Sequence, residues 1–189
     1  MSGGLIQFPN PAETFSFLGP GQFNHTTYLN KYFSHITDLG QAANIIHETL
    51  HAFFISKFNA AIGDSAKMRE LAEVYGGVYS EAFDTTWLAS VARSSTYQHD
   101  LIITNYLAAF SQALYEFGVA RGMGGWLTRA LCKDLAYWGT WDSDMFAALP
   151  STDKKRIQER FALELDPSGA LGLGMPQPPY FNPWGTPCP

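Results

Sequence analysis

The segment from residue 38 to residue 62 constrains this chain most, because its apolar side chains repeat with the period of an α-helix. Asp38 and Gln41 have the spacing of a capping box, which favours a helix start. Apolar residues then recur three to four apart: Ile46, Leu50, Phe54, Phe58 and Ile62. Gly63 follows and favours a helix end. The pattern therefore predicts a buried helix of about 24 residues, roughly 36 Å long.

Similar patterns predict helices along most of the remaining chain. They cover residues 65–75, a short stretch near 84, a long stretch from 95 to 120, residues 126–138 and residues 151–165. Ser95 with Gln98 is the predicted cap of the long helix, and Ser151 or Thr152 that of the last one. In the helix over 65–75 the predicted inward residues are Met68, Leu71, Ala72 and Tyr75. The chain is therefore expected to be mainly α.

The helical patterns divide the sequence into three parts. Residues 1–36 are rich in aromatics, Gly, Pro and Asn, and their short apolar bursts fit either strands or coil. Residues 37–165 form the predicted helical core, and residues 166–189 form a Pro/Gly-rich tail that we expect to pack on the body. A length of 189 residues suits a single domain. The opening Met-Ser-Gly-Gly has the look of an added start, so we expect one domain of a longer protein.

Composition and charge exclude several classes of partner. The net charge of −5 argues against a nucleic-acid binder, which needs a clustered basic surface, and gives no reason to expect an anionic membrane. No run of 18 apolar residues predicts a membrane span. Cys132 lies in a helical pattern and is predicted to be a core thiol, while Cys188 lies in the tail. Two such cysteines make no disulfide framework and leave the redox compartment open.

The stretch NIIHETLHAFF, residues 44–54, places two histidines four apart on the predicted long helix. Residues at i and i+4 share one face, so His47 and His51 can point ring nitrogens at one zinc ion, at about 2.0–2.1 Å. Glu48 is rotated by about 100° around the helix and can reach a water on that ion. The alternative is a pair of partly buried histidines bonded to backbone carbonyls.

A catalytic zinc site normally takes a third protein ligand, and the sequence offers seven candidates: His25, His35, Glu70, Glu73, Glu81, His99 and Asp100. His99 is favoured because it falls in line with the inward stripe of the long helix. The pattern of the helix over 65–75 points Glu70 and Glu73 to solvent. Asp100 fits a carboxylate that holds an imidazole or one that favours the helix start. Tyr106, seven residues past His99, is a candidate donor to an oxyanion, with core packing as the alternative.

Taken together, these motifs resemble those of known metallopeptidases. The segment IIHETLHAFF is similar to the active-site helix of zincins. Together with QHDLIITNYL, FSQALYEFG and DLAYWGTW, it resembles small metallopeptidase domains at the ends of long bacterial secreted or repeat-containing proteins, which are interpreted as toxins or effectors. The resemblance covers roughly residues 38–165. It implies a single-domain, zincin-like helical fold with a small N-terminal strand or coil region.

The resemblance also implies site residues and partners. It implies zinc held by His47, His51 and His99, with Glu48 as the general base. It implies an effector or self-processing protease, secreted or delivered as part of a larger bacterial protein, with a protein or peptide substrate. An immunity or adaptor protein is the partner expected if the chain is an interaction module. The metzincin spacing of a third histidine is absent. A weaker likeness to DNA-repair proteases conflicts with the acidic charge.

These observations lead to one main expectation and two alternatives. The main expectation is a zinc-dependent peptidase that uses Glu48 to activate water. One alternative is a helical protein-interaction module whose zinc is structural or absent. The other is a zinc hydrolase that cleaves a non-peptide amide. The sequence leaves the substrate and the scissile bond open.

Overall fold

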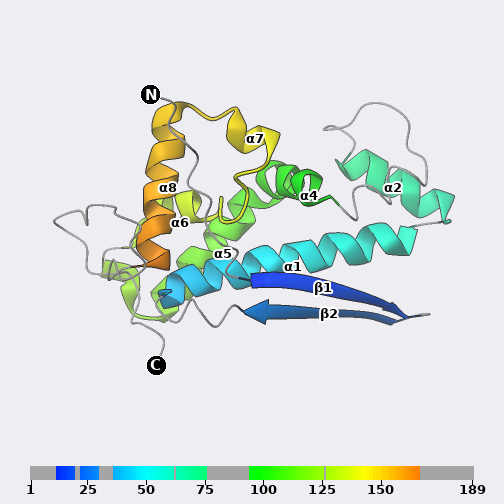
Figure 1. The fold of residues 1–189 in the computed structure, drawn as a ribbon, viewed down its shortest axis with the longest axis horizontal. Helices are drawn as coiled ribbons and strands as arrows, with labels where there is room; N and C mark the ends of the chain where they lie inside the picture. Colours follow the sequence, from blue (N-terminus) through cyan, green and yellow to red (C-terminus); the bar gives the residue numbers. More distant parts are fainter. Residues whose placement is uncertain are drawn as a thin grey trace.

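The computed structural model describes residues 36–61, 63–75, 94–125 and 127–166 with their side chains, except that of Ala72, and the backbone of residues 12–19 and 22–29. Within these ranges the protein is one mainly α-helical domain, which confirms the predicted fold class (Figure 1). None of the described helices is both long and apolar enough to span a bilayer. The predicted short helix near residue 84 lies outside the described residues.

The N-terminal segment contributes a β-hairpin. Strands β1 (Ala12–Gly19) and β2 (Gln22–Leu29) pair antiparallel, with Gly19 opposite Gln22 and Ala12 opposite Leu29. The hairpin runs alongside helix α1 and packs against it (Figure 1). Of the two structures that the sequence allowed here, strand and coil, the chain forms strands over these sixteen residues.

Helix α1 (Asp38–Ala61) has the predicted 24 residues, but its cap differs from the prediction. The hydroxyl of Thr37, not the Asp38 carboxylate, accepts the backbone N–H of Gly40 at 3.0 Å. Asp38 pairs instead with Arg121, whose Nε lies 3.2 Å from Oδ2. The cap therefore lies one residue earlier than predicted, and the Asp38 carboxylate takes part in a long-range ion pair. Beyond the helix, Gly63 takes the positive φ of +84° that ends it.

The buried face of α1 is also rotated from the predicted one in its first half. Ile46 and Leu50 are only half-buried, although they pack against the core. The inward positions there belong to small and polar residues: Ala43, Asn44, His47 and Glu48. In the second half Phe54 and Phe58 are fully buried, as predicted. Helix α1 therefore turns a polar stretch inward at its middle and an aromatic stretch inward near its end.

Helix α2 (Ser65–Tyr75) has the predicted bounds. The carboxylate of Asp64 caps it, because Oδ1 accepts the N–H groups of Ala66 and Lys67, both at 3.1 Å. Leu71 and Tyr75 are buried against α1, as the pattern predicted, and Met68 is partly buried.

The predicted long helix from residue 95 is not continuous. Helix α4 (Ser95–Leu101) is followed by a π-helical turn, η3 (Ile102–Tyr106), and then by α5 (Leu107–Ala120). A π-turn adds a residue to the helical period and shifts the faces on either side of it. The capping residue is Ser94, whose hydroxyl accepts the N–H of Tyr97, and not the predicted Ser95. A cap can move by one residue because neighbouring serines both offer a hydroxyl.

The elements after α5 complete the described part of the fold. A 3₁₀ turn, η4 (Met123–Gly125), precedes helices α6 (Arg129–Leu135), α7 (Asp144–Ala147) and α8 (Ser151–Leu165). The predicted helix over 126–138 is shorter than expected, since Thr128 caps α6 and turns follow Leu135. The predicted Ser or Thr cap of α8 is wrong. The Pro150 carbonyl accepts the N–H groups of Asp153 and Lys154 and starts that helix without a side-chain cap.

Cys132 on α6 is fully buried, which confirms the predicted core thiol. Burial raises the pKa of this thiol to about 11, so it stays protonated near neutral pH. Cys188 lies outside the described residues.

Glu164 ties the end of α8 to the start of α1. Its backbone carbonyl accepts the N–H of Thr37 at 2.9 Å, and its carboxylate accepts the Thr37 hydroxyl. The side chain is buried, and its Oε1 atom has no hydrogen-bond partner. Burial raises the pKa of Glu164 to about 7 against the opposing effects of Thr37 and Arg160, and nearby Asp38 raises it further.

We expect Glu164→Gln to gain stability relative to the unmodified protein as the pH rises. The pKa of this carboxyl is 4.5 unfolded and about 7 folded, so between these values only the folded state keeps the proton. Ionisation should remove about 3 kcal/mol from the unfolding free energy of the unmodified protein by pH 8. Below pH 4.5 the carboxyl is protonated in both states and the difference between the proteins is constant. Urea unfolding of both proteins between pH 4 and pH 8 measures the difference in their unfolding free energies. Half-exposed Glu159→Gln is the control, and a pH-independent difference for Glu164→Gln would contradict the assignment.

Candidate metal centre

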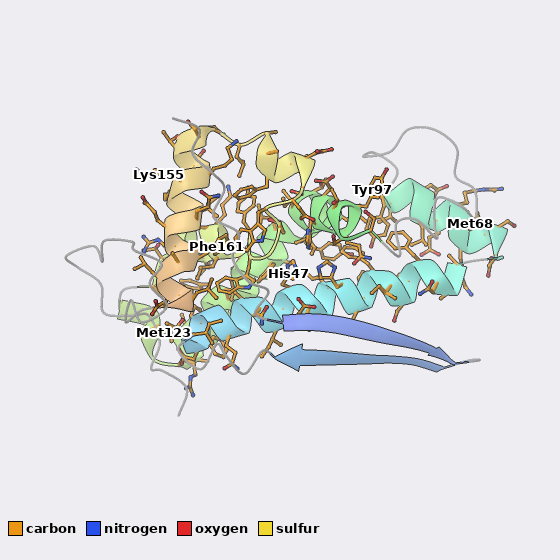
Figure 2. The ribbon with its side chains drawn as sticks, viewed as in Figure 1. His47, Met68, Tyr97, Met123, Lys155 and Phe161 are labelled. Atoms are coloured by element: carbon orange, nitrogen blue, oxygen red, sulfur yellow. The ribbon has the colours of Figure 1, made fainter. Side chains whose placement is uncertain are left out.

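Three histidine rings meet at one point between α1 and α4. The Nε2 atom of His51 lies 2.8 Å from Nε2 of His47 and 3.0 Å from Nε2 of His99. Helical spacing brings the first two together, because they stand one turn apart on α1. His99 comes from α4, 48 residues further along the chain. Figure 2 shows His47 on the side of α1 that faces away from the hairpin.

The outer nitrogens of two of these rings have oxygen acceptors. His51 Nδ1 lies 2.5 Å from Oε1 of Gln98, and His99 Nδ1 contacts Oδ1 of Asp142. An amide oxygen and a carboxylate oxygen both accept, so each Nδ1 carries the proton and each Nε2 presents a lone pair. The third outer nitrogen, His47 Nδ1, is buried. The backbone of Trp138 lies near enough to raise the pKa of this ring, although no hydrogen bond of ordinary geometry joins them.

This arrangement of lone pairs fits a cation. Two imidazole lone pairs facing each other at 3.0 Å repel unless a positive charge lies between them. Burial, followed by the neighbouring histidines, lowers the pKa of His47 well below its usual value. Burial and the nearby His99 lower the pKa of His51 to about 4. His51 is therefore not expected to relieve the repulsion by taking up a proton near neutral pH.

The donor set indicates which ions suit the site. Neutral imidazole nitrogens favour zinc and similar transition metals over magnesium or calcium, which prefer oxygen. A tetrahedral zinc ion with nitrogens at about 2.0–2.1 Å holds them roughly 3.3 Å apart, so the rings need only a small outward movement to accept it. Among the described residues, His47, His51 and His99 form the group able to hold such an ion.

Residues 138–142, here called the strap, cross the histidine cluster between α6 and α7. At one end Gly139 touches the His47 ring, and at the other Asp142 bonds His99. The rings of Trp138 and Trp141 pack edge-on against Phe161 of α8, with centroids 5.2 and 4.7 Å away. The strap thus anchors the histidines to the aromatic core around α8.

Asp142 is set up as a charged acceptor. Burial raises the pKa of its carboxyl, but hydrogen bonds from His99 and Ser95 and the electrostatic effect of His99 outweigh burial and lower the pKa overall. Its side chain remains 46% exposed, so its charge is partly screened by solvent.

We expect Gly139→Ala to weaken metal binding and destabilise the protein. Gly139 has a φ of +75°, and a Cβ there would lie 2.7 Å from both Cε1 and Nε2 of His47. Gly122→Ala is the matched control, because Gly122 has a φ of +82° and nothing within 4 Å of the added Cβ. The left-handed conformation should lower stability by about 1–2 kcal/mol in both variants. Zinc affinity should fall only in Gly139→Ala. Chelator competition measures it, and equal affinities in the two variants would contradict the contact.

The predicted general base lies beside the cluster in the sequence and is buried. Glu48 is 7% exposed and follows His47 on the inward face of α1. It is not part of the three-histidine group, and its role as the general base stays a prediction.

Tyr106 lies in an aromatic cluster at the end of η3. Its ring packs on Phe53 and Phe54, with centroids 5.8 and 5.5 Å away. Its hydroxyl lies 2.7 Å from that of Tyr75 on α2. Either hydroxyl can be the donor in this pair, so Tyr106 can accept from Tyr75 and still donate elsewhere, and its role as an oxyanion donor stays a prediction.

The other candidate ligands stand apart or lie outside the described residues. Glu70 and Glu73 are exposed on α2, as their pattern predicted. Asp100 Oδ1 accepts the N–H of Met145 at 3.1 Å, and the carboxylate that contacts Nδ1 of His99 is that of Asp142. The side chains of the remaining three, His25, His35 and Glu81, are not described.

Three residues of the site were not identified from the sequence: Gln98, Gly139 and Asp142. Gln98 had a signal, since it precedes His99, but it was assigned to a cap. Gly139 directly follows the predicted helix over 126–138, and nothing in the local pattern points to a contact with His47. Asp142 lies 43 residues from the ring that it bonds, and no local pattern connects the two.

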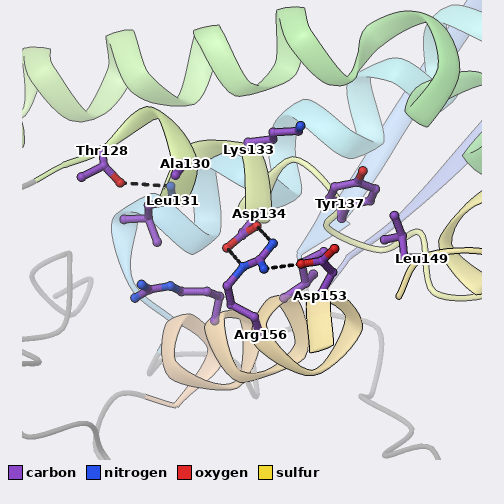
Figure 3. A pocket seen from close by; sticks show the side chains of 11 residues that line it. Thr128, Ala130, Leu131, Lys133, Asp134, Tyr137, Leu149, Asp153 and Arg156 are labelled. Carbon is purple, nitrogen blue, oxygen red and sulfur yellow. Dashed lines mark hydrogen bonds and ion pairs between the residues drawn. The ribbon is translucent and has the colours of Figure 1, made fainter. Parts of the chain in front are cut away.

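A separate groove lies between α6 and α8, away from the histidines (Figure 3). Arg156 crosses it and donates two hydrogen bonds to the Asp134 carboxylate, at 2.9 and 3.0 Å, and another to Asp153. The pair with Asp134 links α8 to α6, whereas that with Asp153 lies within α8, and none of the three histidines lines the groove. The groove is therefore not an extension of the metal centre.

The chain was compared with known proteins. A scan of family models, a search of curated proteins and a search of solved structures all find no match.

Proposed function

We propose that this protein is a zinc-dependent hydrolase of peptide bonds. The observation that carries the proposal is the meeting of three Nε2 atoms, with that of His51 2.8 Å from His47 and 3.0 Å from His99, while two of the outer nitrogens bond oxygen acceptors. Three nitrogen ligands with a fourth position left for water is the pattern of catalytic zinc. The resemblance of the first motif to zincins adds the reaction class.

The residues of the centre would have separate roles in binding the metal and transferring the proton. His47, His51 and His99 would hold zinc, which polarises the scissile carbonyl and acidifies a water molecule. Glu48 accepts the proton of the attacking water and returns it to the leaving amine. Gln98 and Asp142 keep the rings of His51 and His99 in the tautomer that binds metal. The strap, residues 138–142, would form one wall of the metal centre.

Metal analysis combined with a cleavage assay tests the proposal. Protein purified without chelator should contain one zinc per chain and should cleave members of a broad peptide library. A chelator should abolish cleavage, and added zinc should restore it. Protein that binds zinc but cleaves no peptide, while hydrolysing other amides, would point to the non-peptide hydrolase. If the protein binds no zinc, both hydrolase proposals fail, and the helical interaction module is the function that remains.

A further inference from the structure

The Asp142 carboxylate joins three parts of the site. Oδ1 contacts Nδ1 of His99, while Oδ2 accepts the hydroxyl of Ser95 at 3.3 Å and that of Thr96 at 3.4 Å. Both hydroxyls belong to the first turn of α4, the helix that carries His99 one turn later. The carboxylate therefore clamps the start of α4 to the strap and to the ring at the same time.

His99 needs such support more than the other two histidines. His47 and His51 share the backbone of α1, which fixes their relative position. His99 belongs to a seven-residue helix that continues directly into a π-turn. Its ring can rotate about its own side-chain bonds, and a partner on Nδ1 fixes the direction in which Nε2 points.

We propose that Asp142 is the positioning residue for His99, and that Ser95 and Thr96 hold its carboxylate in place for this task. The inference rests on the metal centre of the proposed function. Asp142 touches neither substrate nor ion. It sets the orientation of one ligand and makes that ligand a stronger donor, because an anion at Nδ1 raises the electron density of the imidazole.

The stability gained from the Asp142–His99 contact does not explain this arrangement. Asp142 is nearly half exposed, and at such an exposed position even a full ion pair contributes little to stability. Loss of the carboxylate should therefore change metal binding much more than folding. This distinction separates a positioning role from a merely structural one.

The test measures zinc affinity and the spectrum of the cobalt form, and neither needs a substrate. Asp142→Ala should bind zinc about 10- to 100-fold more weakly, the usual effect of losing a partner of a metal-ligating histidine. Asp142→Asn should lose less, because its amide oxygen can still accept from Nδ1. The double variant Ser95→Ala/Thr96→Ala should weaken zinc in the same direction while keeping the carboxylate. The visible spectrum of the cobalt form should change in Asp142→Ala, since the His99 ring reorients.

Asp144→Asn is the matched control. Asp144 is an exposed carboxylate two residues further on, in the first turn of α7, and its loss should leave zinc affinity unchanged. Asp142→Ala affinity within twofold of the unmodified protein, with the same cobalt spectrum, would overturn the inference. Equal weakening by Asp144→Asn would overturn it too. If Asp142→Ala does not fold, unchanged affinity in both Asp142→Asn and the double variant overturns it. If the unmodified protein binds no metal, both the proposed function and this inference fail. If the unmodified protein binds zinc and the Asp142 and Ser95/Thr96 variants bind it equally well, only this inference fails.

Discussion

Glu48→Gln is expected to abolish peptide cleavage while leaving zinc bound. General-base catalysis contributes about 10²- to 10⁴-fold to rate, so the variant should lose at least two orders of magnitude in kcat. The amide has the size of the carboxylate but cannot accept the proton of the attacking water. The zinc content should stay at one ion per chain, because Glu48 is not among the ligand residues. Metal analysis and the peptide-library assay on the same preparation measure both quantities.

The control for this experiment is another glutamate of the chain. Glu73→Gln removes an exposed carboxylate on α2 and should keep both full activity and full zinc content. Full activity in Glu48→Gln would show that the mechanism is wrong even if zinc is present. Loss of zinc in Glu48→Gln would instead show that the carboxylate supports the ion directly.

Zinc removal is expected to lower the thermal stability of the protein substantially. The ion would join α1 to α4 through ligands 48 residues apart, and it would also relieve the repulsion between the Nε2 atoms of His51 and His99. At zinc concentrations about 1,000-fold above Kd, binding adds roughly 4 kcal/mol to the unfolding free energy. For a chain of this length that corresponds to a rise in Tm of roughly 8–16 °C. Thermal scans with chelator and with excess zinc measure the shift.

Two comparisons make the shift specific to the centre. Magnesium at the same concentration should leave Tm unchanged, because neutral nitrogen donors suit it poorly. His99→Ala should lose most of the response to zinc, since it removes the ligand that joins the two helices. A zinc-induced shift of full size in His99→Ala would show that the ion binds elsewhere.

Local patterns were sufficient wherever a feature depends on a few consecutive residues. The bounds of α2 follow from a cap at Asp64 and an apolar period, and the length of α1 follows from its stripe and from Gly63. The common direction of His47 and His51 follows from helical geometry alone. These features need no distant partner, so the chain encodes them locally.

Other features depend on distant partners and were missed or misjudged. The cap of α1 falls on Thr37, which also bonds Glu164, 127 residues away, and the Asp38 carboxylate bonds Arg121, 83 residues away. The first half of α1 turned Ala43 and Asn44 inward in place of Ile46 and Leu50, because the helix face is chosen by what packs on it. The π-turn at η3 interrupts a pattern that reads as one continuous helix.

The sequence by itself determined that this chain would be mainly α and that two imidazoles of one helix would share a face. It also indicated His99 as the third member, through its place in an apolar stripe, but kept other ligands open. Only the tertiary structure decided that His99 meets the pair, that Asp142 and Gln98 bond the outer nitrogens, and that Gly139 lies against His47. The physical reason is that helical periodicity fixes directions within one turn, whereas these contacts depend on how separate helices and the strap pack together.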